Sequence, residues 1–239
     1  MCGLVGILQA GGASLEARLA ELRRMNQTLV HRGPDAEGYW RSEDGEAALG
    51  HRRLSIVELS EAGAQPMRSG SGRYVIAFNG EIYGHRALRA ELERAGHSFR
   101  GDSDTEVILA AVEAWGFEGA LGRLGGMFAL AIWDTRERCL LLARDRMGEK
   151  PLFYAHTGGL FLFASELKAL LAHPALEPRI DPIAFGRYLR HGYVPAPGAI
   201  LKGVRKLPPG HLLVIPIAEA GATARPSTPY WSLREVALE

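Results

Sequence analysis

The sequence is poor in cysteine, balanced in charge and free of long apolar runs. It holds 2 cysteines among 239 residues, too few for the disulfide framework of a small secreted domain. Its 28 Lys and Arg nearly cancel its 27 Asp and Glu, so no charge excess indicates nucleic acid or an acidic membrane surface as a partner. No segment approaches the ~20 apolar residues of a membrane span, and the N-terminal segment lacks the pattern of a secretory signal. We therefore expect a cytoplasmic protein that binds neither nucleic acid nor membrane.

Hydrophobic residues are plentiful enough for a packed core. At 47% of 239 residues, they favour one domain with a short appendage. Apolar periodicity predicts strands at 3–8, 73–79, 128–133, 139–143, 160–164 and 211–215, and helices after 14, at 88–92, from 103, at 167–171 and at 182–189. Strands that neighbour both helices and other strands favour a layered α+β fold over a doubly wound one. Asn79-Gly80 is expected to end its strand, and the Gly- and Pro-punctuated stretch 218–229 to be an exposed linker.

Cys2 is the first candidate for chemistry. Removal of Met1 would leave it with a free α-amine, whose ordinary pKa is near 7.7–8.0, beside a thiol whose pKa is near 8.5. One residue would then supply both the nucleophile and its base. The alternative is a cysteine that packs as a small apolar residue on a buried strand. Taken alone, Met-Cys-Gly favours that alternative.

A series of segments reverses this preference. In chain order they are 1–7 (MCGLVGI), 31–35 (HRGPD), 50–56 (GHRRLSI), 78–83 (FNGEIY), 103–106 (SDTE), 143–152 (ARDRMGEKPL) and 163–168 (FASELK). Together they resemble the class II glutamine amidotransferase domain of glutamine-dependent asparagine synthetases, over roughly residues 1–232. The resemblance implies the N-terminal nucleophile hydrolase fold, a four-layer α/β/β/α sandwich around two antiparallel sheets. It also implies that L-glutamine is hydrolysed to glutamate and ammonia through a thioester on Cys2.

The resemblance assigns the oxyanion donors to Asn79 and Gly80. Asn79 offers two side-chain N–H groups, and Gly80, which lacks a Cβ, allows a backbone N–H to approach closely. The alternative for the dipeptide alone is a two-residue hairpin turn. Its place in the matched segment favours the catalytic role.

Recognition of glutamine requires a cation for the α-carboxylate and an anion for the α-ammonium. The resemblance places the cation at Arg53, whose guanidinium fork suits a carboxylate, and Arg52 is expected to point to the opposite face of an extended segment. The anion is Asp104, in the first turn of a helix capped by Ser103, where the helix N-terminus favours the ionised carboxylate. The remaining residues expected to line the substrate are Leu54, Ser55, Ile56, Val57 and Glu81.

Other polar residues are interpreted as structural. His31, Arg32 and Asp35 are expected to order the pocket by hydrogen bonding, since an N-terminal nucleophile needs no separate histidine base, and His51 is likewise structural. Cys139 is expected in the core. No Cys or His spacing matches a metal site, and no Gly-rich Lys-Ser/Thr loop for phosphate occurs. We expect no metal and no cofactor in this domain.

The resemblance divides the chain into a glutaminase domain, 1–217, and a segment, 218–239, that leads toward a C-terminal synthetase domain. That second domain, in cis or as a split subunit, would bind ATP and Mg and activate a carboxylate, most simply that of aspartate. Two alternatives stay open: an acceptor from a natural-product or glycan pathway, and a non-catalytic relic of the fold. Retention of the catalytic and binding residues disfavours the relic. A homodimer also stays open.

Overall fold

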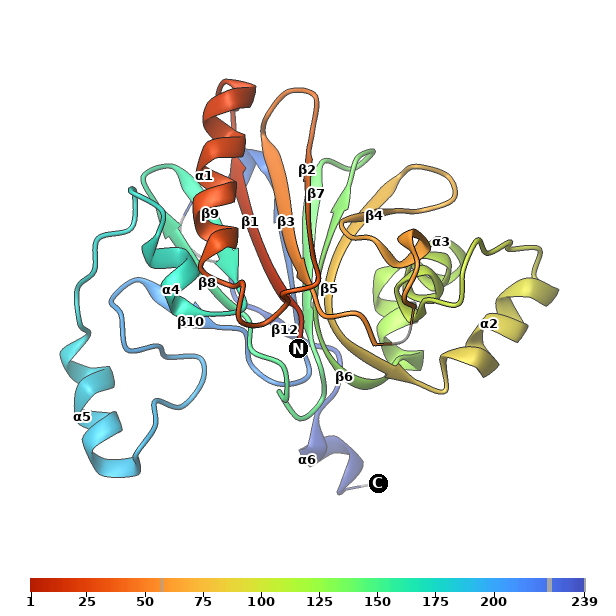
Figure 1. Ribbon diagram of the computed structural model, residues 1–239. Coiled ribbons are helices and arrows are strands. Elements are labelled where there is room, and N and C mark those ends of the chain that lie inside the picture. Colours follow the sequence, from red (N-terminus) through yellow and green to blue (C-terminus); the bar gives the residue numbers. More distant parts are fainter. Residues whose placement is uncertain (57, 223–224, 239) are drawn as a thin grey trace.

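The computed structural model describes residues 1–56, 58–222 and 225–238 (Figure 1). Within them, two six-stranded sheets have the orders β10-β8-β9-β1-β3-β2 and β12-β11-β7-β6-β5-β4. Every pairing is antiparallel. The strands are β1 (Gly3–Gln9), β2 (Ala36–Arg41), β3 (Ala47–Arg53), β4 (Met67–Arg68), β5 (Tyr74–Tyr83), β6 (Gly125–Asp134), β7 (Cys139–Arg144), β8 (Phe153–Thr157), β9 (Leu160–Ala164), β10 (Val204–Lys206), β11 (His211–Pro216) and β12 (Thr228–Pro229).

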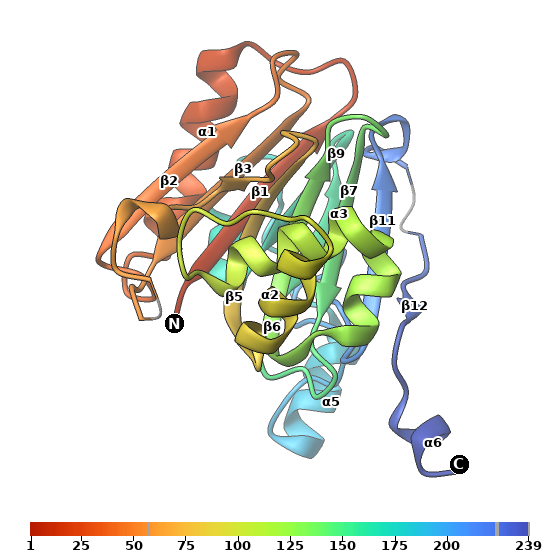
Figure 2. The same cartoon turned by 90° about the vertical axis from the view of Figure 1, so that its right-hand side faces the viewer.

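Helices cover both outer faces of the sheet pair (Figures 1 and 2). They are α1 (Leu15–Gln27), α2 (His85–Arg94), α3 (Asp104–Arg123), α4 (Leu167–Leu171), α5 (Pro182–His191) and α6 (Leu233–Val236), with 3₁₀ turns η1 (Glu61–Gly63) and η2 (Ile217–Glu219). α1 and α4 pack on the first sheet, α2 and α3 on the second, and a separate apolar core fills the space between the sheets. The four-layer α/β/β/α sandwich is therefore confirmed.

The expected strands and helices are all present, with one boundary wrong. Asn79-Gly80 does not end its strand, because β5 continues to Tyr83 and stays paired with β6 throughout. Gly80 is needed for this pairing, since a Cβ there would lie 2.2 Å from the carbonyl oxygen of Met127. β3 was not predicted, and it is buried along its whole length, so its side chains lack the polar alternation that marks a half-exposed strand.

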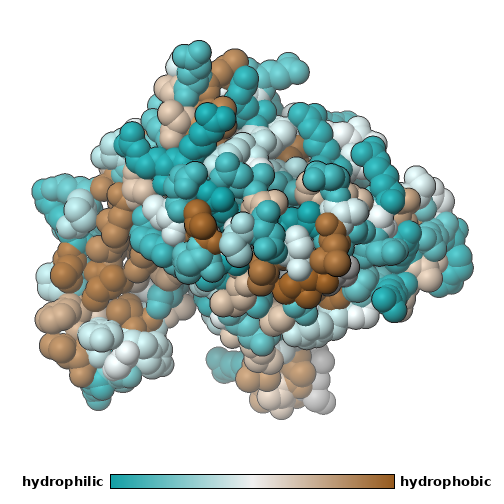
Figure 3. Space-filling view, in the orientation of Figure 1, coloured by the Kyte–Doolittle hydropathy of each residue, from teal (hydrophilic) through white to brown (hydrophobic). Residues whose placement is uncertain are grey.

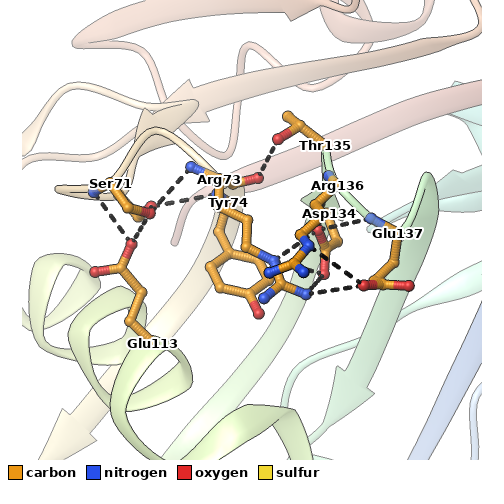
Figure 4. Close-up of polar contacts among 9 residues, drawn as sticks. Ser71, Arg73, Tyr74, Glu113, Asp134, Thr135, Arg136 and Glu137 are labelled. Carbon is orange, nitrogen blue, oxygen red and sulfur yellow. Dashed lines mark hydrogen bonds and ion pairs between the residues drawn. The ribbon is translucent and has the colours of Figure 1, made fainter.

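The register of β5 on β6 is fixed at the end far from Asn79 (Figure 4). The Arg73 guanidinium binds the buried Asp134 carboxylate through three bonds: Nε donates to Oδ1 at 3.0 Å and to Oδ2 at 3.2 Å, and Nη2 donates to Oδ2 at 2.7 Å. The Thr135 N–H donates to the Arg73 carbonyl at 2.9 Å. Since a slip of one residue would turn every β5 side chain to the other face, this cluster helps to hold Asn79 on its face.

The stretch expected to be an exposed linker is attached to the domain. Most of its described residues are exposed, but Ala220 is fully buried and Thr228–Pro229 pairs with β11. The Tyr230 hydroxyl then donates to the Arg144 carbonyl at 2.9 Å. Of the helices in the described ranges, none has the length and apolar character needed to cross a membrane.

Candidate active site

A pocket beside the N-terminal end of β1 gathers most of the predicted site. The predicted residues that line it are Cys2, Arg53, Leu54, Ile56, Asn79, Gly80, Glu81 and Asp104. They come from segments far apart in sequence, so the fold and not local sequence assembles them.

Strand alternation explains why Cys2 and Asn79 meet. On β1, the side chain of Leu4 belongs to the core between the sheets. Because side chains two residues apart on a strand share a face, Cys2 lies on the same face as Leu4. On β5, Val75 and Ala77 belong to that core as well, and Asn79 follows them on the same face. The two sheets thus present a thiol and an amide toward each other where the apolar core between them ends.

The Cys2 thiol is half-buried and bonded to the backbone of Leu54. Its Sγ lies 3.6 Å from the Leu54 carbonyl, to which it donates, and it accepts from the Leu54 N–H at 3.4 Å. Burial raises the pKa of the Cys2 thiol, against the opposing effects of the Leu54 N–H and of the positive charges on the chain terminus and Arg53. At neutral pH the group is therefore a thiol, and its attack on a carbonyl needs a base.

The loop at 31–35 holds the backbone of the nucleophile. Arg32 Nε donates to the Cys2 carbonyl at 2.8 Å, and its Nη1 donates to Glu166 Oε1 at 2.9 Å. His31 Nε2 lies 3.0 Å from the same carboxylate oxygen. These bonds agree with the interpretation of His31 and Arg32 as residues that order the pocket.

Asn79 lines the pocket and has a buried side-chain donor that is unpaired among the described residues. The side chain is 1% exposed, and its Nδ2 has no hydrogen-bond partner among the residues the structure describes. A buried polar group without a partner typically costs roughly 1–3 kcal/mol, and such groups are rare in native proteins. A ligand oxygen in the pocket would supply the missing acceptor.

Arg53 lies on the face of β3 that includes Leu49, which belongs to the core between the sheets. Its Nη1 donates to the Ser60 carbonyl at 3.0 Å, and its Nη2 donates to the Glu58 carbonyl. These bonds fix the guanidinium and use two of its five donors. Arg52, on the opposite face as expected, pairs instead with Glu37 at 2.6 Å.

The segment after Arg53 only partly lines the pocket. Leu54 and Ile56 do so, but Ser55 does not. The Ser55 N–H is already bound to Asp35 Oδ2 at 2.8 Å, so this group is not available to the substrate, and a contact through the rest of Ser55 stays a prediction. Val57 lies outside the described residues.

Asp104 is the first residue of α3. Ser103 caps this helix through the Thr105 N–H, and Asp104 Oδ2 accepts from the Ile82 N–H at 3.0 Å. Burial raises the pKa of the Asp104 carboxyl and outweighs the bond from Ile82. The expected pull of the helix N-terminus toward the ionised form is therefore opposed by desolvation. Glu106, three residues after Ser103, does not complete a capping box by accepting from the Ser103 N–H, because it accepts from the Arg100 and Gly101 N–H groups instead.

Sequence reasoning missed several lining residues, chief among them Glu58, Gln65 and Lys150. Lys150 is 7% exposed and forms no ion pair with any described residue. Its backbone is held by the Asp145 carboxylate at 3.0 Å and by Arg144 Nε at 2.7 Å. The segment 143–152 marked the family, but nothing in its spacing assigned Lys150 to the pocket.

The rest of the predicted structural residues lie as expected. Cys139 packs in the core under α3, and His51 is fully buried. Over the described ranges, no three His, Cys, Asp or Glu side chains lie close enough together to hold a metal ion.

Comparisons with known proteins agree with this arrangement. Residues 1–231 match the family model described as "Glutamine amidotransferase domain". The chain is 39% identical over 216 residues to "Asparagine synthetase [glutamine-hydrolyzing] 3" of Bacillus subtilis (strain 168), covering 89% of this chain and 34% of that protein. It is 42% identical over 225 residues to a "Putative asparagine synthetase [glutamine-hydrolyzing]" of Mycobacterium tuberculosis (strain ATCC 25618 / H37Rv), covering 88% and 34%. "Amidase chry2" of Gibberella zeae (strain ATCC MYA-4620 / CBS 123657 / FGSC 9075 / NRRL 31084 / PH-1) is 33% identical over 253 residues, covering 98% and 34%.

Among solved structures, the glutamine phosphoribosylpyrophosphate amidotransferase of B. subtilis, complexed with ADP and GMP, superposes with a TM-score of 0.71. It is 21% identical and covers 96% of this chain and 49% of that one, so it supports the fold alone. The chain spans about a third of the length of the curated relatives described above.

Proposed function

The chain belongs to the glutamine amidotransferase domain family, and from that membership we propose that it hydrolyses the side-chain amide of L-glutamine with Cys2 as nucleophile. The observation that carries the proposal is the buried Asn79 Nδ2, unpaired among the described residues, in one pocket with the Cys2 thiol. A carbonyl attacked by that thiol becomes an oxyanion, which needs such a fixed donor. The Gly80 backbone N–H is proposed as the second donor.

The chemistry follows from a free α-amine on Cys2. Once Met1 is removed, this amine takes the thiol proton, and the sulfur adds to the carboxamide carbon. The amine returns the proton to the nitrogen, the C–N bond breaks and ammonia leaves, so that a γ-glutamyl thioester remains. Water, deprotonated by the same amine, then adds to the thioester, the C–S bond breaks and glutamate is released with the thiol restored.

Substrate binding uses the charged ends of the pocket. Arg53, partly fixed by the Glu58 and Ser60 carbonyls, is proposed to bind the α-carboxylate. Asp104 and Glu81, which line the pocket as well, are proposed to bind the α-ammonium. This arrangement would place the side-chain amide of glutamine toward Cys2.

A second domain is proposed to consume the ammonia. The relatives are about three times as long as the matched region, and several are named asparagine synthetases. We therefore propose an ATP- and Mg-dependent partner domain, in cis or as a split subunit, that activates aspartate. The similarity to "Amidase chry2" keeps a different acceptor as the second candidate.

An exposed apolar surface supports such a partner. Apolar residues gather over α5, at the lower left of Figure 3, and their side chains are largely exposed. They are Ile180, Ile183, Phe185, Tyr188, Leu189 and Tyr193. α6 adds the exposed Leu233 and Val236 at the same end of the molecule (Figures 1 and 2). Patches of this kind mark interaction sites.

Residues 1–217 are proposed as the glutaminase unit, and residues 218–239 are proposed to connect it to the partner domain. The first part of this connecting segment still packs on the glutaminase unit. A thiol nucleophile must stay reduced, which supports a cytoplasmic location. An alternative proposal is that the exposed apolar surface joins two copies of the chain in a homodimer.

The test is a glutaminase assay on the purified chain. Wild type is expected to form one glutamate and one ammonia for each glutamine, and Cys2→Ala to form none. Cys139→Ala is the matched control, because it removes the other cysteine from the core and leaves the pocket intact. A folded wild type that lacks Met1 and binds glutamine without hydrolysing it would establish the non-catalytic relic instead.

A further inference from the structure

The Gln65 side chain connects two parts of the pocket. Its Oε1 accepts from the Phe78 N–H at 2.7 Å, and its Nε2 donates to Thr105 Oγ1 at 3.2 Å. Phe78 directly precedes Asn79, and Thr105 directly follows Asp104. One amide group therefore lies between the strand that carries the oxyanion donor and the helix that carries the carboxylate.

The position of Gln65 explains why its side chain is used. β4 pairs with β5 as Met67↔Ile76 and Arg68↔Val75, and the same register continued would place residue 65 opposite Phe78. The Gln65 carbonyl instead lies against Gly38 of β2, where an added Cβ would come within 1.9 Å of the oxygen. The side-chain amide thus replaces a missing strand carbonyl.

The other backbone polar group of Phe78 is bound by a side chain as well. Its carbonyl accepts from His51 Nε2 at 2.9 Å. Both backbone groups of this residue are consequently fixed by side chains, while Asn79 next to it keeps the strand pairing with Ala129 of β6. Because the backbone of its neighbour is held in this way, the Asn79 side-chain amide keeps one orientation, as an oxyanion donor must.

We propose that Gln65 is a positioning residue that sets the distance between the oxyanion donor Asn79 and the ammonium-binding Asp104. This inference rests on the proposed glutaminase function. Loss of the Gln65 amide frees the Phe78 N–H and the Thr105 hydroxyl together, so the substrate is no longer held at both ends in one geometry. A misplacement of about 1 Å can cost on the order of 10² in rate.

The test compares Gln65→Leu, Thr105→Val and Ser69→Ala for kcat and KM with glutamine. Gln65→Leu removes both bonds, and we expect kcat to fall about tenfold or more while KM rises. Thr105→Val removes only the bond to the helix, and we expect KM to rise with kcat nearly unchanged. Ser69→Ala is the matched control, since Ser69 Oγ accepts from the Tyr74 N–H of the same strand at 3.2 Å but lies away from the pocket.

A merely structural role predicts that Gln65→Leu and Ser69→Ala lower the melting temperature alike and leave both kinetic constants within twofold of wild type, which would overturn the inference. If Gln65→Leu does not fold, Thr105→Val decides, and an unchanged KM in that variant would overturn the inference as well. Wild type without glutaminase activity would instead reject the proposed function, so the two failures are distinguishable.

Discussion

His51 of β3 and Phe78 of β5 join the two sheets through a bond of 2.9 Å between Nε2 and the carbonyl oxygen. Because a carbonyl only accepts, Nε2 carries the proton, and Nδ1 is left as an acceptor with no partner in the described part of the chain. The ring is fully buried, and desolvation lowers the pKa of His51 to about 4 from 6.5. The link between the sheets therefore consists of a neutral imidazole.

The first prediction concerns stability in acid. The folded pKa of His51 lies below its unfolded value, so the unfolded state binds more protons between pH 6.5 and pH 4. The stabilisation is complete above pH 6.5 and is lost as the pH falls toward 4. As the pH falls from 7 to 5, we expect this residue to lower the free energy of unfolding by about 2 kcal/mol. Urea unfolding at both pH values measures the loss.

The control for this prediction is His51→Gln, whose amide can donate to the same carbonyl but does not titrate. We expect its loss between the two pH values to be smaller than that of wild type by about 2 kcal/mol. Equal losses in both proteins would show that His51 is not the group responsible. Comparison by difference is needed because burial also lowers the pKa of His156 and His173.

Much of the fold could be predicted from the sequence where the apolar spacing is regular. The site could be predicted where a sequence motif marked its residues. The strand of β5 was predicted only as far as Asn79, because Asn-Gly is a local turn signal while pairing with β6 is a long-range effect. Gln65 was missed for a similar reason. Its two partners lie 13 and 40 residues away, and no local pattern reports such contacts.

The second prediction concerns Met1. In the structure Met1 lines the pocket, and the chain's amine is one residue away from the nucleophile. We expect activity to rise in proportion to the fraction of protein that lacks Met1, since only that fraction has the amine on Cys2. Intact mass and glutamate formation, measured before and after treatment with methionine aminopeptidase, test this. Full turnover with Met1 retained would refute the α-amine as the base.

The third prediction separates chemistry from binding. Asn79→Ala removes the proposed oxyanion donor, so we expect kcat to fall by roughly 10²–10³ with a modest change in KM. Steady-state kinetics with glutamine measure both constants. An Asn79→Ala variant altered only in KM would mean that the oxyanion role is misassigned.

The fourth prediction concerns the α-carboxylate. Arg53→Lys keeps the charge but loses the planar fork, so we expect KM for glutamine to rise with little change in kcat. Arg52→Lys is the matched control, because Arg52 pairs with Glu37 on the opposite face of β3. If both variants raised KM equally, the effect would come from the strand and not from a contact with the substrate.

The last prediction concerns the ionisation of Asp104. Burial raises the pKa of its carboxyl, so the carboxylate is protonated at a higher pH than an ordinary aspartate as the pH falls. Since the ionised form is the one proposed to bind the α-ammonium of glutamine, we expect KM to rise on the acid side in wild type. Asp104→Asn keeps an oxygen for the Ile82 N–H but has no charge, so its KM should be high and independent of pH in this range. Glu106→Gln, which neutralises a carboxylate on the same helical turn outside the pocket, should keep both the wild-type KM and its acid dependence. An acid dependence that persists in Asp104→Asn would assign the ammonium contact to another carboxylate of the pocket, with Glu81 as the next to be replaced.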